Sequence, residues 1–416
     1  MPDPPQELRP AAGAGLSGHL DRNDACGQVI EKTGLSLGLP EADLCVLFAS
    51  GKHTLYLPEL CTRVREMFNP QVVMGVSAQG VIGGETELEE ETGLSLFALR
   101  APGMTLKPFQ SRNLSVIPEE LTRDSQRRLI QETGMDADSR GTLLFGDPFS
   151  TPLLRLLPAL SRAHEGLGID TPLPISGGMA SAAKEPGENT LVINEDVTSQ
   201  GAIGVTIGGD ITMDTVVSQG CRPIGSPHII TKAQRNILFT LGNRPALEII
   251  RETIESLDEE DRELLSNGMF IGRAVSEYKE RLGPGDFLIR AVMGVDEQHG
   301  AIAVGDLFRV GQTVQLHVRD ARSATEDLEF MLAPQSLRIP ALGALLISCN
   351  SRGKQFFGEA GHDASRASAG LRTSDSTVPI SGFFAAGEIG PVMDTSYLHG
   401  HTASIVVFRP GAPATG

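Results

Sequence analysis

The sequence predicts a mixed α/β fold, in which internally repeated β-α-β units form packed sheets flanked by helices. Three observations support this prediction. Short apolar runs alternate with amphipathic segments, glycine-rich turns follow several of these runs, and a later stretch alternates apolar and polar residues. Strands that alternate with helices are typical of α/β proteins, whereas the later stretch is typical of an antiparallel meander.

The first β-α-β unit is predicted between residues 43 and 83. The apolar run LCVLFAS is typical of a buried strand, and TLYLPELCTRVREMF carries apolar residues at helical spacing. The segment QVVMGVSAQGVIGGE is then predicted to be a strand that enters a glycine-rich turn. The acidic run TELEEE is expected to be a solvated loop, after which GLSLFALR resumes as a strand.

A second unit follows with the same pattern. GTLLFGDPFS is a predicted strand, LLRLLPALSRAHEG a helix and LPISGGMASA a strand that runs into glycines. TLVINED and GAIGVTIGGDITMDTVVS supply further strands. From about Ile229 to Leu282 the patterns become helical, in RPALEIIRETIESL, EDRELLSNGMF and AVSEYKERL, and this segment is expected to connect two halves.

The third unit comes after the meander FLIRAVMGVDEQHGAIAVGDLFRVGQTVQLHVRDA. ALLISCNSRGK is a predicted buried strand that ends in a polar turn, and a helix is expected before about Leu371. VPISGFFAAGEIGPV is a strand into glycines, and GHTASIVVFRP closes the unit as a strand.

The glycine turns indicate an internal repeat. Residues 75–83 match residues 382–390 at five positions without a gap, and residues 174–177 match residues 379–382 as Pro-Ile-Ser-Gly. Three related units are therefore predicted, whose turns converge on one cleft if the units pack together. Glycines let a backbone or a ligand approach closely, although each can instead serve only a sheet crossing or bulge.

Length and composition limit the domain organisation and the partners. The chain of 416 residues favours two domains, predicted as a tail at 1–20, domains at 21–228 and 229–410, and a tail at 411–416. The formal net charge of -17 disfavours nucleic acid and anionic membranes. No signal peptide and no membrane-spanning apolar run is evident, so a cytoplasmic location without membrane insertion is expected.

The cysteines and histidines do not predict a metal or cofactor. Five cysteines without a CxxC spacing are expected to be reduced thiols rather than a zinc site. His399 and His401 could face one side of a strand as two metal ligands, but a third ligand is not evident. No turn matches a complete phosphate-binding or dinucleotide fingerprint. No metal site and no cofactor are therefore assigned.

Several blocks, in order, resemble the FIST domain family of signalling proteins and of a eukaryotic F-box protein. These blocks are GVSAQGVIGGE, FGDP, ISGG, GAIGVTIGGD, VSQGCRPIGSPHIIT, the FLIRAVMGVD meander, ISCNSRGKQFFG and GFFAAGEIGP. The resemblance covers most of the chain and implies a FIST N part followed by a FIST C part. It also implies a sensory, ligand-binding module for small molecules such as amino acids, or, as in the F-box member, a substrate-recruiting surface.

The candidate site is centred on the strand end at residues 350–353. Ligands in open α/β sheets usually lie at carboxyl ends of strands, and Arg352 can hold a carboxylate with two hydrogen bonds. An Arg in this position serves as often in a structural salt bridge. Glu388 is a candidate partner for a ligand's ammonium group, and the alternative is a solvated or Arg-paired Glu.

Other candidates come from the equivalent turns. Asp147 occupies the same strand end in the middle unit, although it can instead close an Asx-turn. Arg222 lies in a polar break beside Cys221, which is expected to be a buried thiol. The predicted ligand-binding residues are Asn350, Ser351, Arg352, Gly353, Gly387, Glu388, Gly390, Ser77, Gly80, Gly146, Asp147, Gly177, Gly178 and Arg222.

Three functions remain open at this point. The leading one is a sensory module that binds a small molecule or signals through a partner protein. The second is a protein-interaction module, which requires an exposed apolar patch. The third is a hydrolase that uses Cys349 or Ser351 with His399, although no catalytic residue is assigned.

Overall fold

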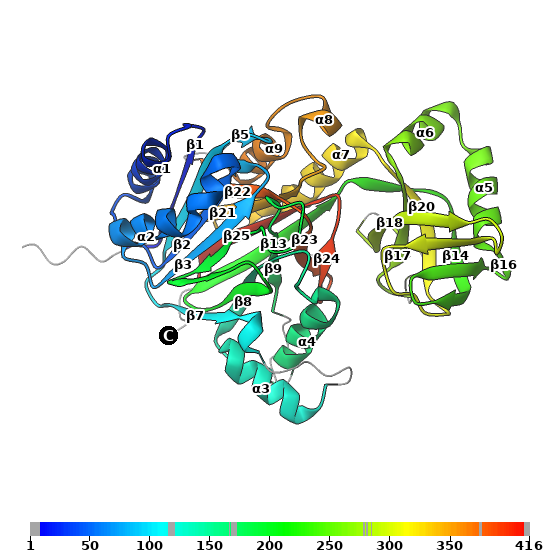
Figure 1. The fold of residues 1–416 in the computed structure, drawn as a ribbon, viewed down its shortest axis with the longest axis horizontal. Helices are drawn as coiled ribbons and strands as arrows, with labels where there is room; N and C mark the ends of the chain where they lie inside the picture. Colours follow the sequence, from blue (N-terminus) through cyan, green and yellow to red (C-terminus); the bar gives the residue numbers. More distant parts are fainter. Residues whose placement is uncertain are drawn as a thin grey trace, which may run out of the picture. The chain divides into compact units, whose positions relative to one another are not determined.

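The computed structural model describes residues 9–114, 121–165, 167, 173–277, 279, 282–283, 285–373 and 377–411. The chain forms two compact units. The first consists of the described residues within 1–217, 331–398 and 402–416, and the second consists of those within 218–330 and 399–401. The fold is mixed α/β, as predicted from the sequence (Figure 1).

Three six-stranded sheets with the same strand order build the first unit. The first sheet is β1 (Ala11–Ser17), β6 (Gly93–Arg100), β2 (Leu44–Ser50), β3 (Val72–Ala78), β10 (Leu191–Ile193) and β11 (Asp196–Thr198). The second is β7 (Met104–Gln110), β12 (Ala202–Gly209), β8 (Ser139–Gly146), β9 (Ile175–Met179), β23 (Glu388–Val392) and β24 (Thr395–His399). The third is β13 (Ile211–Gln219), β25 (Thr402–Pro410), β21 (Gly343–Cys349), β22 (Ile380–Ala385), β4 (Val81–Gly83) and β5 (Thr86–Leu88).

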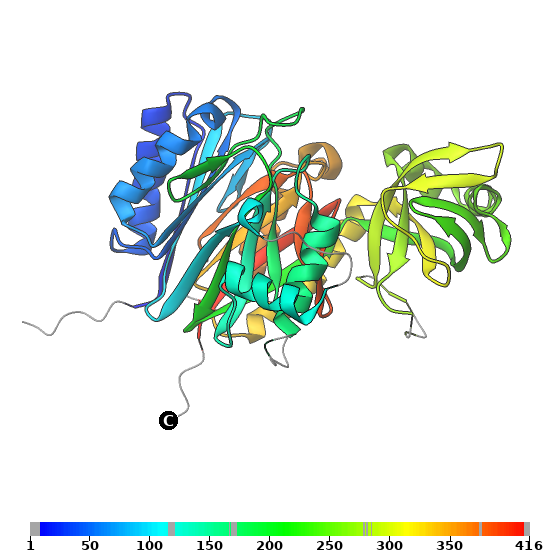
Figure 2. The ribbon, with the colours of Figure 1, turned by 60° about the horizontal axis from the view of Figure 1, so that its bottom comes forward.

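Each sheet contains one parallel pair joined by a helical connection. These pairs are β2–β3, β8–β9 and β21–β22, so the three predicted β-α-β units are confirmed. Helices cover the outer side of the sheets (Figures 1 and 2). They are α1 (Arg22–Leu37), α2 (Leu57–Phe68), α3 (Arg123–Thr133), α4 (Leu153–Glu165), α8 (Lys354–Phe357) and α9 (His362–Leu371), with short 3-10 turns at Gly51–Tyr56, Ser111–Asn113 and Ala333–Leu337.

The repeats exchange hairpins in a cycle. Strands β4 and β5 follow β3 in the chain but join the third sheet, where β4 pairs with β22 and β5 pairs with β4. Strand β23 follows β22 but pairs with β9 of the second sheet, and β10 follows β9 but pairs with β3 of the first. Each repeat therefore completes the sheet of another, and the first unit has the order of a pseudo-threefold assembly within one chain.

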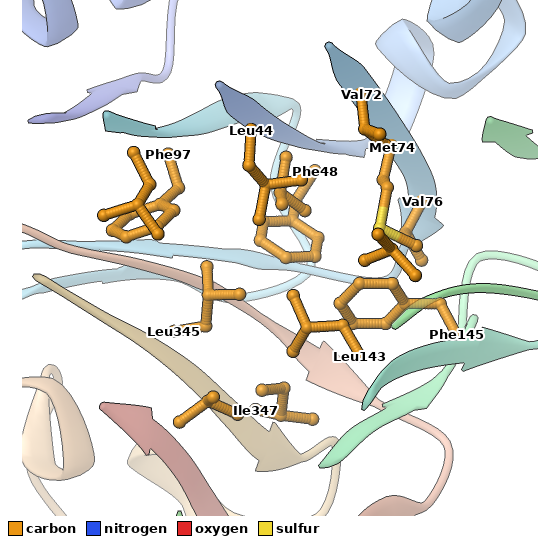
Figure 3. Packing of buried hydrophobic residues seen from close by; sticks show 14 of the residues in the cluster. Leu44, Phe48, Val72, Met74, Val76, Phe97, Leu143, Phe145, Leu345 and Ile347 are labelled. Atoms are coloured by element: carbon orange, nitrogen blue, oxygen red, sulfur yellow. The ribbon is translucent and has the colours of Figure 1, made fainter. Parts of the chain in front are cut away.

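The inner faces of the three sheets share one apolar core (Figure 3). At its centre the rings of Phe48, Phe145 and Phe383 lie 4.8 to 5.9 Å apart between centroids, and each comes from a different sheet. Leu143 and Ile347 are fully buried in the same cluster. Burial of aromatic area at a point where all three repeats meet stabilises the assembly as a whole.

The second unit is an antiparallel barrel inserted in the third repeat at residues 218–330, and it includes most of α7 (Ala321–Leu332). Pairing of β14 with β15 closes the sheet, which removes exposed strand edges. Its strands, in sheet order, are β14 (Cys221–Gln234), β20 (Thr313–Arg319), β17 (Met269–Ala274), β18 (Phe287–Asp296), β19 (Ala301–Val304), β15 (Ile237–Leu241) and β16 (Arg244–Pro245). The unit also contains α5 (Ala246–Ser256), α6 (Glu259–Leu264) and a 3-10 turn at Leu265–Asn267. Of the meander predicted from the sequence, the antiparallel β18–β19 pair is confirmed, whereas β20 pairs with β17 and β14 rather than with β19.

Strand β1 lies inside the segment that was expected to be a tail, so this expectation is wrong for residues 11–17. β1 pairs with β6 along seven residues, and α1 packs against it. A Cβ atom at Gly13 or Gly15 would lie 2.3 or 2.5 Å from a backbone oxygen of α1. The absence of a side chain at Gly13 and Gly15 therefore allows α1 to approach β1 closely. The small residues of this amino-terminal segment thus have a role in packing.

The connector between Ile229 and Leu282 is less helical than expected. α5 confirms one helical pattern, but α6 is short and β15 and β17 occupy much of the segment. The predicted helix AVSEYKERL begins at Ala274, which ends β17, and Tyr278, Glu280 and Arg281 lie outside the described residues. Closure of the barrel outweighs local helical propensity here. The short carboxy-terminal tail predicted at 411–416 lies outside the described residues beyond Gly411.

Candidate ligand-binding cavity

A cavity of about 460 Å³ opens in the first unit, where elements of the first and third repeats meet. The β3–β4 turn contributes Gln79 and Gly80, and the segment after β5 contributes Glu89 and Glu90. The loop after β21 contributes residues 350–355, and Gly358 and Phe384 complete the lining. The hairpin exchange explains why two turns so distant in the sequence share one cavity.

Of the repeated glycine turns, only the one at residues 75–83 contributes a glycine, Gly80, to this cavity, where it meets the polar loop after β21, so the predicted convergence of the three turns on one cleft is not seen in this lining. Five predicted site residues line this cavity: Gly80, Asn350, Ser351, Arg352 and Gly353.

Glu89 fixes the loop that follows β21. The backbone N–H of Lys354 donates to both carboxylate oxygens of Glu89, at 2.8 and 3.0 Å. Gly353 has a φ of 152°, and a Cβ atom there would lie 2.4 Å from Glu89 Oε2. The glycine is thus required both by its backbone conformation and by the approach of Glu89.

Hydrogen bonds join three other polar side chains of the lining, those of Asn350, Gln79 and Glu90. The Asn350 side-chain amide donates to Gln79 Oε1 at 3.3 Å, and Gln79 Nε2 donates to Glu90 Oε1 at 2.9 Å. The backbone N–H of Gln79 donates to Ser181 Oγ at 2.9 Å. Glu90 has a φ of 54°, which non-glycine residues seldom adopt, and such conformations are concentrated at functional sites.

Arg352 is buried, with 1% of its surface exposed, and it pairs with a carboxylate of the protein itself. Its Nε and Nη2 donate to Asp363 Oδ2 and Oδ1 at 2.7 and 2.8 Å. Burial alone would raise the pKa of Asp363, but the Arg352 guanidinium lowers it well below its usual range. Arg352 therefore adopts the structural salt bridge that the sequence left open, and it anchors the cavity loop to the first turn of α9.

Glu388 is fully buried rather than solvated or placed in the cavity lining. The backbone N–H and the hydroxyl of Thr402 donate to its Oε2 at 3.1 and 2.7 Å. Burial raises the pKa of Glu388 to about 8, against the opposing hydrogen bonds from Thr402. Gly387 and Gly390, its neighbours in β23 and the preceding turn, also lie outside the described lining of this cavity. A Cβ atom at Gly390 would lie 2.5 Å from the Val217 side chain.

Ser77 and Asp147 belong to a separate buried hydrogen-bond network. Asn189 Nδ2 donates to Asp147 Oδ1 at 2.9 Å, and Ser77 Oγ lies 3.4 Å from Asn189 Oδ1. Asp147 also accepts a hydrogen bond of 2.6 Å from Ser150 Oγ, as in the local turn that the sequence left open. Gly146 precedes Asp147 at the end of β8, and none of these residues lines the cavity.

Gly177 and Gly178 serve sheet packing. A Cβ atom at Gly177 would lie 2.0 Å from the Leu144 carbonyl oxygen, and one at Gly178 would lie 2.7 Å from the Ile347 side chain. Gly75, Gly177 and Gly382 occupy the same register position, opposite Leu47, Leu144 and Leu346 of the paired strand. The repeated glycines therefore serve the packing of paired strands in each repeat. Of the turns that follow them, the one at Gln79 and Gly80 lines the cavity.

Arg222 and His401 lie in the second compact unit. Arg222 donates to Asp261 and, at 2.9 Å, to Asp320, so two carboxylates of the protein hold it. The His401 ring packs edge-on against Phe270, with 4.6 Å between centroids. Cys349 Sγ lies 3.1 Å from Ser351 Oγ, and His399, the base considered for these two residues, ends β24.

The acidic run 86–91 is not a solvated loop throughout, so that expectation is wrong in part. Glu87 is 9% exposed in β5, accepts a hydrogen bond from the backbone N–H of Ala364, and burial raises its pKa to about 7. Glu89 and Glu90 line the cavity together with Gln79, Lys354 and Gln355. Sequence reasoning missed Gln79, Glu89 and Glu90 because only the hairpin exchange brings them to the loop after β21. It also missed Lys354 and Gln355, which directly follow the predicted residues 350–353.

A search of the described part of the chain finds no cluster of three or more His, Cys, Asp and Glu residues placed to hold a metal ion. Among the described residues, no helix is both long and apolar enough to cross a membrane.

Comparisons with known proteins agree with the order of blocks in the sequence. The FIST N domain model matches residues 43–244, and the FIST C domain model matches residues 246–391. An uncharacterized protein of Mycobacterium tuberculosis is 36% identical, with 95% of this chain and 99% of that protein covered. A Mycobacterium bovis protein is 35% identical, with 95% and 98% covered. A chorismatase crystal structure aligns over 96% of this chain and 98% of that one, at 10% identity and a TM-score of 0.30, a likeness too weak to bear on function.

Proposed function

The chain belongs to the FIST family, and on that premise we propose that it is a sensory module whose small-molecule ligand occupies the cavity between the β3–β4 turn and the loop after β21. FIST domains are generally sensory and ligand-binding.

The observation that carries the proposal is the convergence of polar side chains from two repeats on one cavity. Its volume of about 460 Å³ lies in the range of small-molecule sites. Asn350, Gln79 and Glu90 are joined by hydrogen bonds. The buried Arg352–Asp363 pair ties the loop after β21 to α9. A preformed polar wall of this kind lowers the entropy cost of binding.

Arg352 is not the residue to change in a binding test, because its loss would disturb the fold. Asn350 is exposed at the cavity wall and is the better choice. The matched control is Gln298→Ala, which removes an exposed amide from the second unit.

The test is a thermal-shift screen of the purified protein against amino acids and common metabolites. A compound that binds the native state must raise the melting temperature by mass action. We expect at least one compound whose shift is lost in Asn350→Ala and kept in Gln298→Ala. A screen without any Asn350-dependent shift would contradict the proposal and would favour the protein-interaction alternative.

A further inference from the structure

We propose that the ligand of this cavity is an organic cation, carrying an amine or guanidinium group. This inference rests on the proposed function, because it names the chemical class of the molecule bound at that same site. It departs from the expectation that Arg352 binds a ligand's carboxylate.

The charges of the lining favour a cation. The charged lining residues are Glu89, Glu90, Arg352 and Lys354. Arg352 is neutralised by Asp363 through two hydrogen bonds of 2.7 and 2.8 Å, with both side chains almost completely buried. The remaining charges of the lining are therefore two carboxylates, of Glu89 and Glu90, and one ammonium group, that of Lys354. The formal net charge of -17 on the chain adds a long-range attraction for cations.

The direction of the hydrogen bonds along the wall favours a ligand that donates. The Asn350 amide donates to Gln79, and Gln79 in turn donates to Glu90. Each of these amides uses one of its two N–H groups within the wall, whereas the carboxylate oxygens can each accept more than one hydrogen bond. A ligand rich in N–H groups would satisfy the remaining acceptors of Glu89 and Glu90, and hydrogen bonds between charged partners are the strong ones.

Both carboxylates are held in place before a ligand arrives. The backbone N–H of Lys354 fixes Glu89, and Gln79 fixes Glu90, whose backbone has a φ of 54°. Because the fold already orders these side chains, a cation bound between them would lose little affinity to their immobilisation. A primary amine or a guanidinium offers several N–H groups that can reach both carboxylates at once.

The experiment is isothermal titration calorimetry at low salt with four probes of similar length. Cadaverine is a dication, lysine a monocation with a carboxylate, 6-aminohexanoate a zwitterion and glutarate a dianion. We expect affinity to fall in this order and to fall further for cadaverine as salt is added. Glu90→Gln should weaken cadaverine binding at least about tenfold, since it removes one charged partner.

Two further variants separate charge from damage to the fold. Lys354→Gln removes the opposing positive charge and should tighten cadaverine binding roughly twofold or more, while the backbone N–H that holds Glu89 is retained. Glu31→Gln changes an exposed Glu on α1, outside the described lining, and should leave the affinity unchanged. Melting curves of all variants should match that of the parent.

The inference fails if glutarate binds more tightly than cadaverine, or if Glu90→Gln leaves cadaverine binding unchanged. It also fails if none of the four probes binds, or if Ca²⁺ alone occupies the site in a Glu90-dependent way. An anionic metabolite whose thermal shift depends on Asn350 would overturn the inference and leave the proposed function standing. No Asn350-dependent shift with any compound would contradict both.

Discussion

Removal of the Arg352 guanidinium should destabilise the first unit strongly. In Arg352→Met, Asp363 would keep its hydrogen bonds from Ser348 Oγ at 2.7 Å and His362 Nδ1 at 3.0 Å but lose its charge partner in a site that is 2% exposed. Breaking a buried pair in this way costs about 3–5 kcal/mol. At roughly 2–4 °C per kcal/mol, the melting temperature should fall by roughly 6–20 °C.

The pH dependence of the loss identifies its cause. Without Arg352, burial raises the pKa of Asp363 in the folded state above its unfolded value of about 3.9. A raised folded pKa gives stability that is present at low pH and lost as the pH rises, so the defect should be largest at neutral pH and shrink towards pH 4. The measurement is urea denaturation of the parent and the variant at several pH values.

A double-mutant cycle completes this test. Asp363→Asn combined with Arg352→Met removes both charges, so the double variant should be less destabilised than the sum of the two single variants. If Arg352→Met costs less than about 1 kcal/mol, or if the two losses simply add, then the pair does not anchor the loop as described.

Two further changes follow from the same structure. The pKa of Glu388 is raised to about 8, so this group contributes stability below its unfolded pKa of about 4.3 that is lost as the pH rises through 8. Melting temperatures from pH 4 to 9 should therefore decline less in Glu388→Gln than in the parent. An equal decline in both proteins would contradict the claim that burial raises the pKa of Glu388. A Cβ atom at Gly382 would lie 1.8 Å from the Leu346 carbonyl oxygen, so Gly382→Ala should lower the melting temperature severely. Gly294→Ala, with no atom within 4 Å of the added carbon, is the matched control, and similar effects at both sites would refute this packing argument.

Local patterns in the sequence were sufficient to predict the three β-α-β units. β2 and β21 are buried along their whole length and β8 from Gly141 to its end, and such apolar runs identify buried strands well. The matching glycines also predicted the repeat, because Gly177 and Gly382 each meet a backbone oxygen at the same register position. The polar turn after β21 was expected at a strand end and lies there.

The exchange of hairpins could not be predicted from local patterns. β4 and β5 are only three residues each, and nothing in their sequence shows that β4 pairs with β22, about three hundred residues away. The positions of Glu87, Glu89 and Glu90 depend entirely on that pairing. An acidic run is usually solvated, and only the three-dimensional arrangement gives Glu87 a helix terminus to cap and Glu89 a loop to hold.

The role of Arg352 was also open until its partner was known. Asp363 is eleven residues further on, at the start of α9, in a stretch with little helical periodicity. Burial decides between the two interpretations, since a guanidinium with 1% exposure and two short hydrogen bonds to a carboxylate cannot also serve as the first contact of a ligand.

The most direct test of the central claim is a crystal structure of the protein with the tightest-binding compound from the thermal-shift screen. The ligand should lie between the β3–β4 turn and the loop after β21, within hydrogen-bond distance of Asn350 and Glu90. A ligand bound anywhere else on the chain would contradict the claim that this cavity is the sensory site.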